Sequence, residues 1–255
     1  MPIKEVFPNP TVKQVIFQIK FPNLFSIESK IGDFQTKIIS EFPESSLMFR
    51  KQIVFADIGP EGKIEELPGG PSEGKKIWQF KSEKKITLNI LTSSLDLTSN
   101  YHKTYNNKDA TVRFRDTIQF VLENFLSIVK LPIIQRIGLR YIDECPVPAL
   151  TTASFKEWYN TVFPFERFSI EETMETSYVT LVKRNGYFVR YLESFNAEQN
   201  KYVLDFDSYA QNIKPEDLLG VTDKLHELIS NEFEKTIKTP VIEYMKKPIK
   251  KDEGK

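Results

Sequence analysis

The chain has 255 residues, of which 40% are hydrophobic and 27% are charged, fractions that are ordinary for a globular protein. Its 35 lysines and arginines balance 35 aspartates and glutamates, and this zero net charge disfavours a protein that mainly neutralises nucleic-acid phosphates. The single cysteine, Cys145, excludes a disulfide within the chain. The N-terminus lacks the apolar core of a signal peptide, and no apolar run reaches the ~20 residues of a membrane span. We therefore expect a soluble, cytoplasmic protein.

The first half of the chain alternates strand and helix patterns. Apolar and polar residues alternate in the predicted strands, whereas apolar residues recur at steps of three and four in the predicted helices. A segment with five of the ten glycines and three prolines predicts a loop. In order, the predicted elements are a strand at 12–21, a helix at 24–38, a strand at 46–56, the loop at 57–75, a hairpin of strands at 77–81 and 85–97, and a long helix at 109–129.

The second half of the chain repeats this alternation. Ser154 and Glu157 have the spacing of a capping box, which predicts a helix start. Asn185-Gly186 predicts a tight hairpin turn, because both residues tolerate positive φ. The predicted elements are a strand at 135–144, a short helix at 154–163, strands at 176–183 and 186–195, a strand at 201–209, and a long helix at 218–237.

Both halves therefore follow one order of strand, helix, three strands and long helix. Leu95-Asp96-Leu97 precedes the first long helix, and Leu204-Asp205-Phe206 precedes the second. We interpret this as an internal duplication, although α+β chains also alternate in this way by coincidence. The fold class is α+β, with two similar βαβββα halves, each an antiparallel sheet packed on a long helix, related by a pseudo-twofold axis. The predicted organisation is a single domain at 1–245, made of repeats at about 10–131 and 133–245, and a disordered charged tail at 246–255.

The sequence contains no complete motif for binding a cofactor or a metal. The stretch GGPSEGKK at 69–76 matches part of a phosphate-binding loop, but Lys76 stands where Ser or Thr should hold magnesium, and a strand pattern follows where a helix is needed. His102, His226 and Cys145 lack the paired spacing of metal ligands. We therefore predict no catalytic residue, no metal and no cofactor.

One constellation remains as a candidate ligand-binding site. Arg136, Gly138 and Arg140 occupy alternate positions of one predicted strand, so all three lie on one face. The two guanidinium groups could bind a carboxylate or phosphate, or they could be neutralised by aspartates in a closed ion-pair network. Because the chain supplies two matching aspartates, the network is favoured. The candidate residues are Arg136, Gly138, Arg140, Arg190, Asp205 and Asp207.

The sequence also resembles a known family. The resemblance is carried by the start from Pro10 to Phe21, by W-x-F from Trp78 to Phe80, by R-I-G-L-R-Y-I-D from Arg136 to Asp143, and by L-H-E-x-I-x-x-x-F-E-x-x-I from Leu225 to Ile237. These motifs resemble a sporadically distributed family of functionally uncharacterised bacterial and archaeal proteins of similar length. The resemblance implies one full-length domain and no known activity, and a patchy distribution hints at mobile or defence-associated loci.

These observations favour a non-enzymatic binding or accessory protein that uses the cleft or sheet surface between its halves. The first alternative is a module that binds a small anionic ligand through Arg136 and Arg140. The second is a nucleic-acid-binding saddle, which the zero net charge disfavours. An enzyme with His226 or the Asp205 and Asp207 pair as its base is the least favoured. The partner is then another protein or an anionic ligand, with no membrane role, and the sequence allows a homodimer.

Overall fold

The computed structural model of the chain describes residues 6–50, 75–107, 110 and 112–248. The predicted loop and the phosphate-loop-like stretch lie outside the described residues, apart from Lys75 and Lys76. Most of the predicted charged tail also lies outside them.

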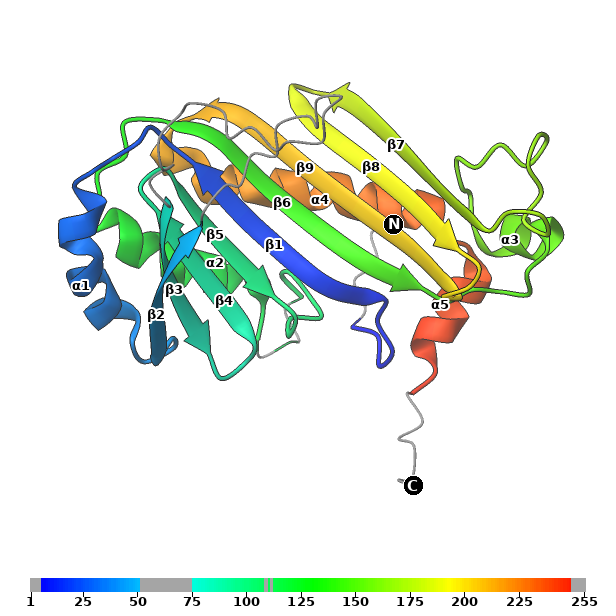
Figure 1. The fold of residues 1–255 in the computed structure, drawn as a ribbon, viewed down its shortest axis with the longest axis horizontal. Helices are drawn as coiled ribbons and strands as arrows, with labels where there is room; N and C mark the ends of the chain where they lie inside the picture. Colours follow the sequence, from blue (N-terminus) through cyan, green and yellow to red (C-terminus); the bar gives the residue numbers. More distant parts are fainter. Residues whose placement is uncertain (1–5, 51–74, 108–109, 111, 249–255) are drawn as a thin grey trace, which may run out of the picture.

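The strands of the described residues form one antiparallel sheet, which runs across the molecule (Figure 1). The fold is therefore α+β, as predicted. The two sheets expected from the two halves are instead joined, among the described residues, into a single sheet of nine strands. Five of these strands belong to the first half, which is therefore βαββββα rather than the predicted βαβββα, and four belong to the second half. Across the sheet the order is β2 (Glu44–Arg50), β3 (Lys75–Ser82), β4 (Ile86–Leu91), β5 (Ser94–Ser99), β1 (Val12–Lys20), β6 (Ile134–Cys145), β9 (Lys201–Ile213), β8 (Tyr187–Asn196) and β7 (Glu175–Arg184).

The first strand of each half lies at the seam where the two halves meet. Strand β1 pairs with β6 in antiparallel fashion, from Val12 opposite Asp143 to Lys20 opposite Arg136. On its other side β1 pairs with β5, and β6 pairs with β9. Two separate sheets would each leave an unpaired strand edge here, and a row of unpaired backbone groups is costly to bury. Pairing β1 with β6 satisfies both edges at once.

The two longest helices, α2 and α4, cover one face of the sheet (Figure 1). We call this the helix face, and we call the opposite face, which is turned toward the viewer in Figure 1, the open face. Helix α4 packs against β6, β8 and β9, and α1 packs against α2. No helix in the described part of the chain has the length and apolarity needed to cross a membrane. The helices are α1 (Ile27–Ile38), α2 (Phe114–Leu126), α3 (Thr152–Trp158), α4 (Leu218–Thr236) and α5 (Thr239–Lys246), with a 3₁₀ turn at Pro215–Asp217.

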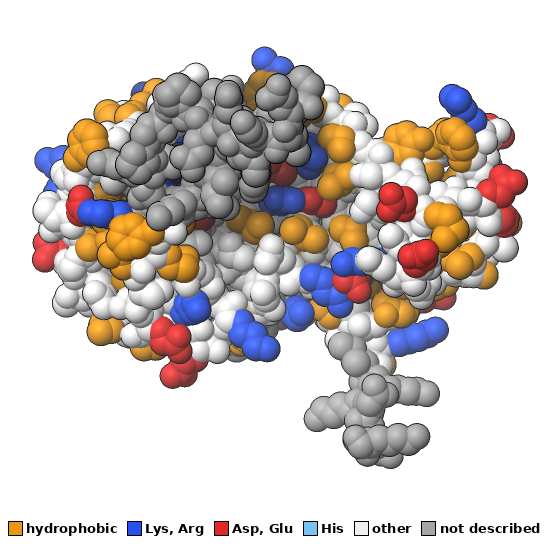
Figure 2. Space-filling view, viewed as in Figure 1, with side chains coloured by type: hydrophobic (Ala, Val, Ile, Leu, Met, Phe, Trp, Pro, Cys, Tyr) orange, Lys and Arg blue, Asp and Glu red, His pale blue; other side chains and the backbone are white. Residues whose placement is uncertain are grey.

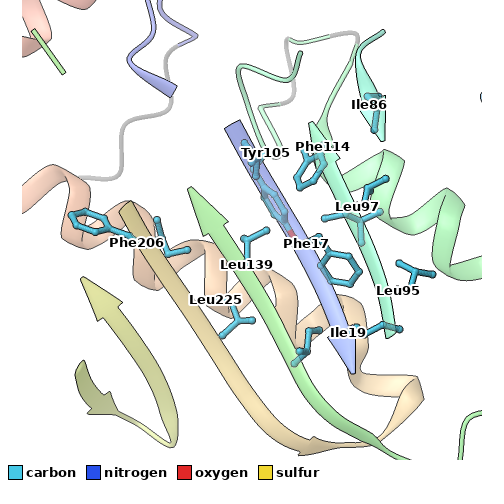
Figure 3. Close-up of a cluster of buried hydrophobic side chains, with 14 of the residues drawn as sticks. Phe17, Ile19, Ile86, Leu95, Leu97, Tyr105, Phe114, Leu139, Phe206 and Leu225 are labelled. Atoms are coloured by element: carbon cyan, nitrogen blue, oxygen red, sulfur yellow. The ribbon is translucent and has the colours of Figure 1, made fainter. Parts of the chain in front are cut away.

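The hydrophobic core lies between the helix face and these helices. Phe17 and Ile19 of β1 are fully buried there, beside Leu95 and Leu97 of β5 and Leu139 of β6 (Figure 3). Each of these residues is two positions from a neighbour on the same strand or opposite one in the pairing register. In these central strands the period of two therefore places most apolar residues on the helix face and most polar residues on the open face.

Three local predictions differ from the structure. The predicted strand at 85–97 is two strands, β4 and β5, joined by a turn at Thr92 and Ser93. Helix α3 spans Thr152–Trp158 rather than 154–163. It begins earlier because the side chain of Thr151 accepts the N-terminal hydrogen bond from the backbone N–H of Ser154, and it ends earlier because the backbone is extended at Tyr159. Helix α5 follows α4 after a break at Ile237, where only one long helix was expected.

Candidate functional site

The six candidate residues lie on the open face, on the adjacent strands β6, β9 and β8. Arg140 of β6 lies opposite Asp207 of β9, and Asp207 lies opposite Arg190 of β8. Residues directly opposite each other in an antiparallel pair share one face. Figure 2, which views this face, shows basic and acidic side chains next to each other near its middle. We call Arg136, Arg140, Arg190, Asp205 and Asp207 the arginine–aspartate cluster.

Arg140 is held by a side-on ion pair with Asp205. Its Nε lies 2.6 Å from Oδ1 of Asp205 and its Nη2 lies 2.5 Å from Oδ2, so two charge-assisted hydrogen bonds run in parallel. The two partners differ in exposure, because the Asp205 side chain is 5% exposed and the Arg140 side chain is 40% exposed. The buried carboxylate therefore depends on an arginine whose outer edge faces solvent.

Arg136 lies flat across the sheet. Its Nη2 donates to both carboxylate oxygens of Asp207, at 2.8 and 3.1 Å, and its Nη1 donates to Oε1 of Gln18 at 3.0 Å. Its guanidinium carbon also lies 4.6 Å from the ring centroid of Tyr209, a cation–π distance. Arg136 thus contacts Asp207, Gln18 and Tyr209. Because Asp205 pairs with Arg140 and Asp207 pairs with Arg136, both arginines belong to the closed ion-pair network that the sequence favoured.

Gly138 makes room for the Arg136 side chain. A Cβ atom at position 138 would lie 2.5 Å from Nη1 and 3.0 Å from the guanidinium carbon of Arg136. These are atoms at the end of a flexible side chain, so an added methyl group would displace the guanidinium rather than the backbone.

We expect Gly138→Ala to lower the free energy of unfolding by about 1 kcal/mol, because Arg136 loses its hydrogen bonds to Asp207 and Gln18. Chemical denaturation of the variant measures this loss. The matched background is Arg136→Ala, in which the arginine is already absent. There Gly138→Ala should be close to neutral, and an equal loss in both backgrounds would contradict the steric explanation.

Arg190 differs from the other two arginines of the cluster. Its side chain forms no hydrogen bond or ion pair with any described residue, although its charge acts on Asp207. Burial raises the pKa of Asp207, and the guanidinium groups of Arg136, Arg140 and Arg190 oppose that rise. The cluster thus holds three arginines and two aspartates, and Arg190 is the arginine that has no ion pair with a described residue.

Polar contacts extend beyond the cluster across β1 and β5. Gln18 of β1 donates from Nε2 to Oδ1 of Asp96 on β5, and Oγ of Ser94 donates to Oδ2 of the same carboxylate at 3.2 Å. Burial raises the pKa of Asp96. A hydrogen-bonded row therefore runs from β5 through β1 and β6 to β9, across the seam of the sheet.

The same row continues toward β7 through aromatic contacts. The ring of Tyr209, under the guanidinium of Arg136, stacks on Phe188 of β8 with centroids 5.0 Å apart. Nζ of Lys183 on β7 then lies 5.4 Å from the Phe188 ring. The sequence patterns did not indicate Gln18, Tyr209 or Phe188 as members of the site. They lie on the open face by the alternation of their strands, but which residues lie beside them depends on the order of the strands in the sheet.

A second polar cluster lies on the helix side and joins the two halves. Asp223 of α4 accepts from Nε and Nη2 of Arg115 of α2 at 2.7 and 3.0 Å, and from Oη of Tyr105 at 2.7 Å. The ring of His226 stacks on Tyr105 at 4.2 Å, and its Nδ1 lies 3.3 Å from Oη of Tyr141. Burial lowers the pKa of His226 to about 4. His226, the base of the enzyme alternative, is thus neutral near pH 7 and packed between two tyrosines.

Two further titratable groups are buried on the helix face near the end of β6. The carboxyl of Asp143 accepts a hydrogen bond of 2.8 Å from Oγ1 of Thr11, and burial raises its pKa to about 7. Burial also raises the pKa of Cys145.

His102 bonds to Ser99 and Thr117 through its two ring nitrogens. Among the described residues, no group of three histidines, cysteines or carboxylates is arranged to hold a metal ion.

No family model and no curated protein matches the chain.

Proposed function

We propose that the chain consists of two copies of one unit, related by a pseudo-twofold axis at the seam between β1 and β6. The strand order supports this, because β1-β5-β4-β3 on one side of the seam corresponds to β6-β9-β8-β7 on the other. A helix follows the first and the last strand of each half. Asp96 and Asp205, from the two similar tripeptides, lie on the strands directly outside the seam. Strand β2 has no counterpart in the second half.

We also propose that the protein is a non-enzymatic binding protein that takes an anionic group on its open face. Arg190 and Arg140 would bind a carboxylate or phosphate that belongs to a small ligand or to a partner protein. The observation that carries the proposal is Arg190, a partly buried guanidinium that has neither a hydrogen bond nor an ion pair with a described residue. A partly buried guanidinium gains most from a charged, bidentate acceptor.

The role of each arginine differs from the sequence-based hypothesis. Arg136 is bound to Gln18 and Asp207 and would only position its neighbours. Arg140 uses Nε and Nη2 for Asp205, so its remaining nitrogen, Nη1, is the part that would reach a ligand. Arg190 would supply the main contact. A nucleic-acid saddle is the weaker alternative, because Asp96, Asp205 and Asp207 place three carboxylates in the middle of this face.

Arg190→Ala should abolish ligand-induced stabilisation without changing the fold. We expect inorganic phosphate, citrate or a poly-glutamate peptide, at about 100 times its dissociation constant, to raise the melting temperature of the native protein by about 5 °C. The variant should show no rise, because the main anion contact is lost. Thermal-shift measurements over this panel test the expectation, and a response only to the peptide would point to a protein partner.

The control is Arg167→Ala, which removes an exposed arginine from the connection between α3 and β7. This variant should respond like the native protein. Equal responses from Arg190→Ala and the native protein, or no response of the native protein to any anion, would contradict the proposal. Salt-sensitive binding of single-stranded DNA that Arg190→Ala weakens would favour the saddle instead.

A further inference from the structure

Strand β7 forms one edge of the sheet, and its outer backbone groups can be assigned from the hairpin that it forms with β8. Asn185 and Gly186 have positive φ values of 51° and 87°, which is typical of the two-residue turn expected there. Arg184 and Tyr187 close this turn, so they exchange backbone hydrogen bonds. The even-numbered residues of β7 therefore bond to β8. The odd-numbered residues point their N–H and C=O groups away from the sheet; they are Glu175, Ser177, Val179, Leu181 and Lys183.

The β7 edge lacks the features that normally protect an edge strand. The strand has ten residues, pairs with β8 without a register shift, and contains no proline. No charged residue occurs between Glu175 and Lys183. On the open face Val179 and Leu181 are 55% and 56% exposed. A long, regular, uncharged edge with exposed apolar side chains is a template for a further strand.

The charges at the two ends of β7 indicate which strand fits. Glu175 lies at one end and Lys183 lies near the other, and both are exposed on the open face. In an antiparallel pair of identical strands, the two ends lie opposite each other. When Val179 lies opposite Val179 of a second copy, Glu175 lies opposite Lys183 of that copy, and the same pair forms again across the axis. This register also places every outward-pointing residue opposite another outward-pointing residue.

We propose that β7 pairs with β7 of a second copy of this chain, antiparallel around a twofold axis at Val179, and that the sheet continues from one copy into the other. The contact is self-complementary, as a twofold interface must be. It would satisfy the outward backbone groups of both strands and place Val179 opposite Val179 of the second copy, with Leu181 of each copy diagonally beside that pair. It does not involve Arg190 or Arg140, so it goes beyond the binding site proposed above.

A charge exchange tests both the dimer and its register. Glu175→Lys should weaken the dimer about tenfold, because two like-charge contacts replace two ion pairs, and Lys183→Glu should do the same. The double variant should recover the native dissociation constant to within about threefold, since the opposite charges face each other again. Sedimentation equilibrium of the full chain over a range of concentrations measures these constants.

A cysteine pair and a proline variant give independent readouts. Directly opposite residues of a hydrogen-bonded pair have Cα atoms about 5.5 Å apart, within the range of a disulfide. Val179→Cys should therefore form a covalent dimer on oxidation, whereas the control Thr180→Cys, displaced from the axis, should not. Val179→Pro removes a donor that points away from β8, so the fold should persist while the dimer is lost.

A native chain that stays monomeric at about 1 mM would overturn the proposal, since that corresponds to a free energy of association weaker than about −4 kcal/mol. A dimer that Val179→Pro leaves intact would place the contact elsewhere. Failure of the double charge exchange to restore the affinity, or cross-linking by Thr180→Cys rather than Val179→Cys, would overturn the register. None of these outcomes depends on anion binding.

Discussion

Replacing Arg140 with alanine is expected to lower the free energy of unfolding by about 2–4 kcal/mol, because it leaves a buried carboxylate without its partner. The side chain of Asp205 is 5% exposed, and both of its oxygens accept hydrogen bonds from Arg140. No other described residue is seen to donate to this carboxylate. Urea denaturation followed by circular dichroism measures the loss.

Arg190→Ala is the matched control, since it removes a guanidinium from the same face without breaking a hydrogen bond to a described residue. We expect it to change the free energy of unfolding by less than about 0.5 kcal/mol. Adding Asp205→Asn to Arg140→Ala should recover part of the loss, because a neutral amide costs less to bury than an unpaired charge. If Arg140→Ala cost no more than Arg190→Ala, the ion pair with Asp205 would not stabilise the sheet.

Raising the pH from about 4 to about 7 is expected to destabilise the protein by about 1–3 kcal/mol through Asp143 alone. Burial raises the pKa of this carboxyl to about 7 in the folded protein, whereas an aspartate in an unfolded chain titrates near 3.9. Between these two values the folded state holds a proton that the unfolded state has released. The free energy of unfolding is therefore highest at low pH, where Asp143 is protonated in the folded protein, and it falls as the pH rises from about 4 to about 7.

Asp143→Asn isolates this contribution, because its neutral side chain does not titrate. The stability of the variant relative to the native protein should improve by about 1–3 kcal/mol between pH 5 and pH 8, measured by denaturation at both values. The control is Glu144→Gln, which makes the same carboxylate-to-amide change at an exposed position of the same strand. A difference for Asp143→Asn that is independent of pH would contradict the assignment.

Local sequence patterns predicted the elements of the fold better than their assembly. The alternation in R-I-G-L-R-Y-I placed two arginines on the face opposite the core, and Asn185-Gly186 located a hairpin turn. The turn at Thr92 and Ser93 was missed, because these residues carry no glycine, proline or asparagine signal. Helix α5 was missed because the apolar pattern continues through Ile237, where the backbone leaves the helix.

The partners of the site residues could not be predicted, because they are distant in the sequence. Gln18 reaches Arg136 only since β1 lies beside β6, and these residues are 118 positions apart. Likewise, Tyr105 and Arg115 meet Asp223 across the two halves. No pattern of local period contains such a pairing. The sequence indicated that two aspartates would neutralise Arg136 and Arg140, but it could not show that Arg190 would form no ion pair with a described residue.

The pairing of β1 with β6 at the centre of the sheet also has a consequence for how the chain folds. Contacts between segments this far apart form slowly, because a long loop must close before they contribute. During synthesis β1 leaves the ribosome well before β6 has been made. In that interval the edge of β1 that later pairs with β6 has no native partner. The strand edge that lies at the centre of the sheet in the folded protein is therefore unpaired in the nascent chain. The yield of correctly folded protein should therefore depend on how quickly translation delivers the second half.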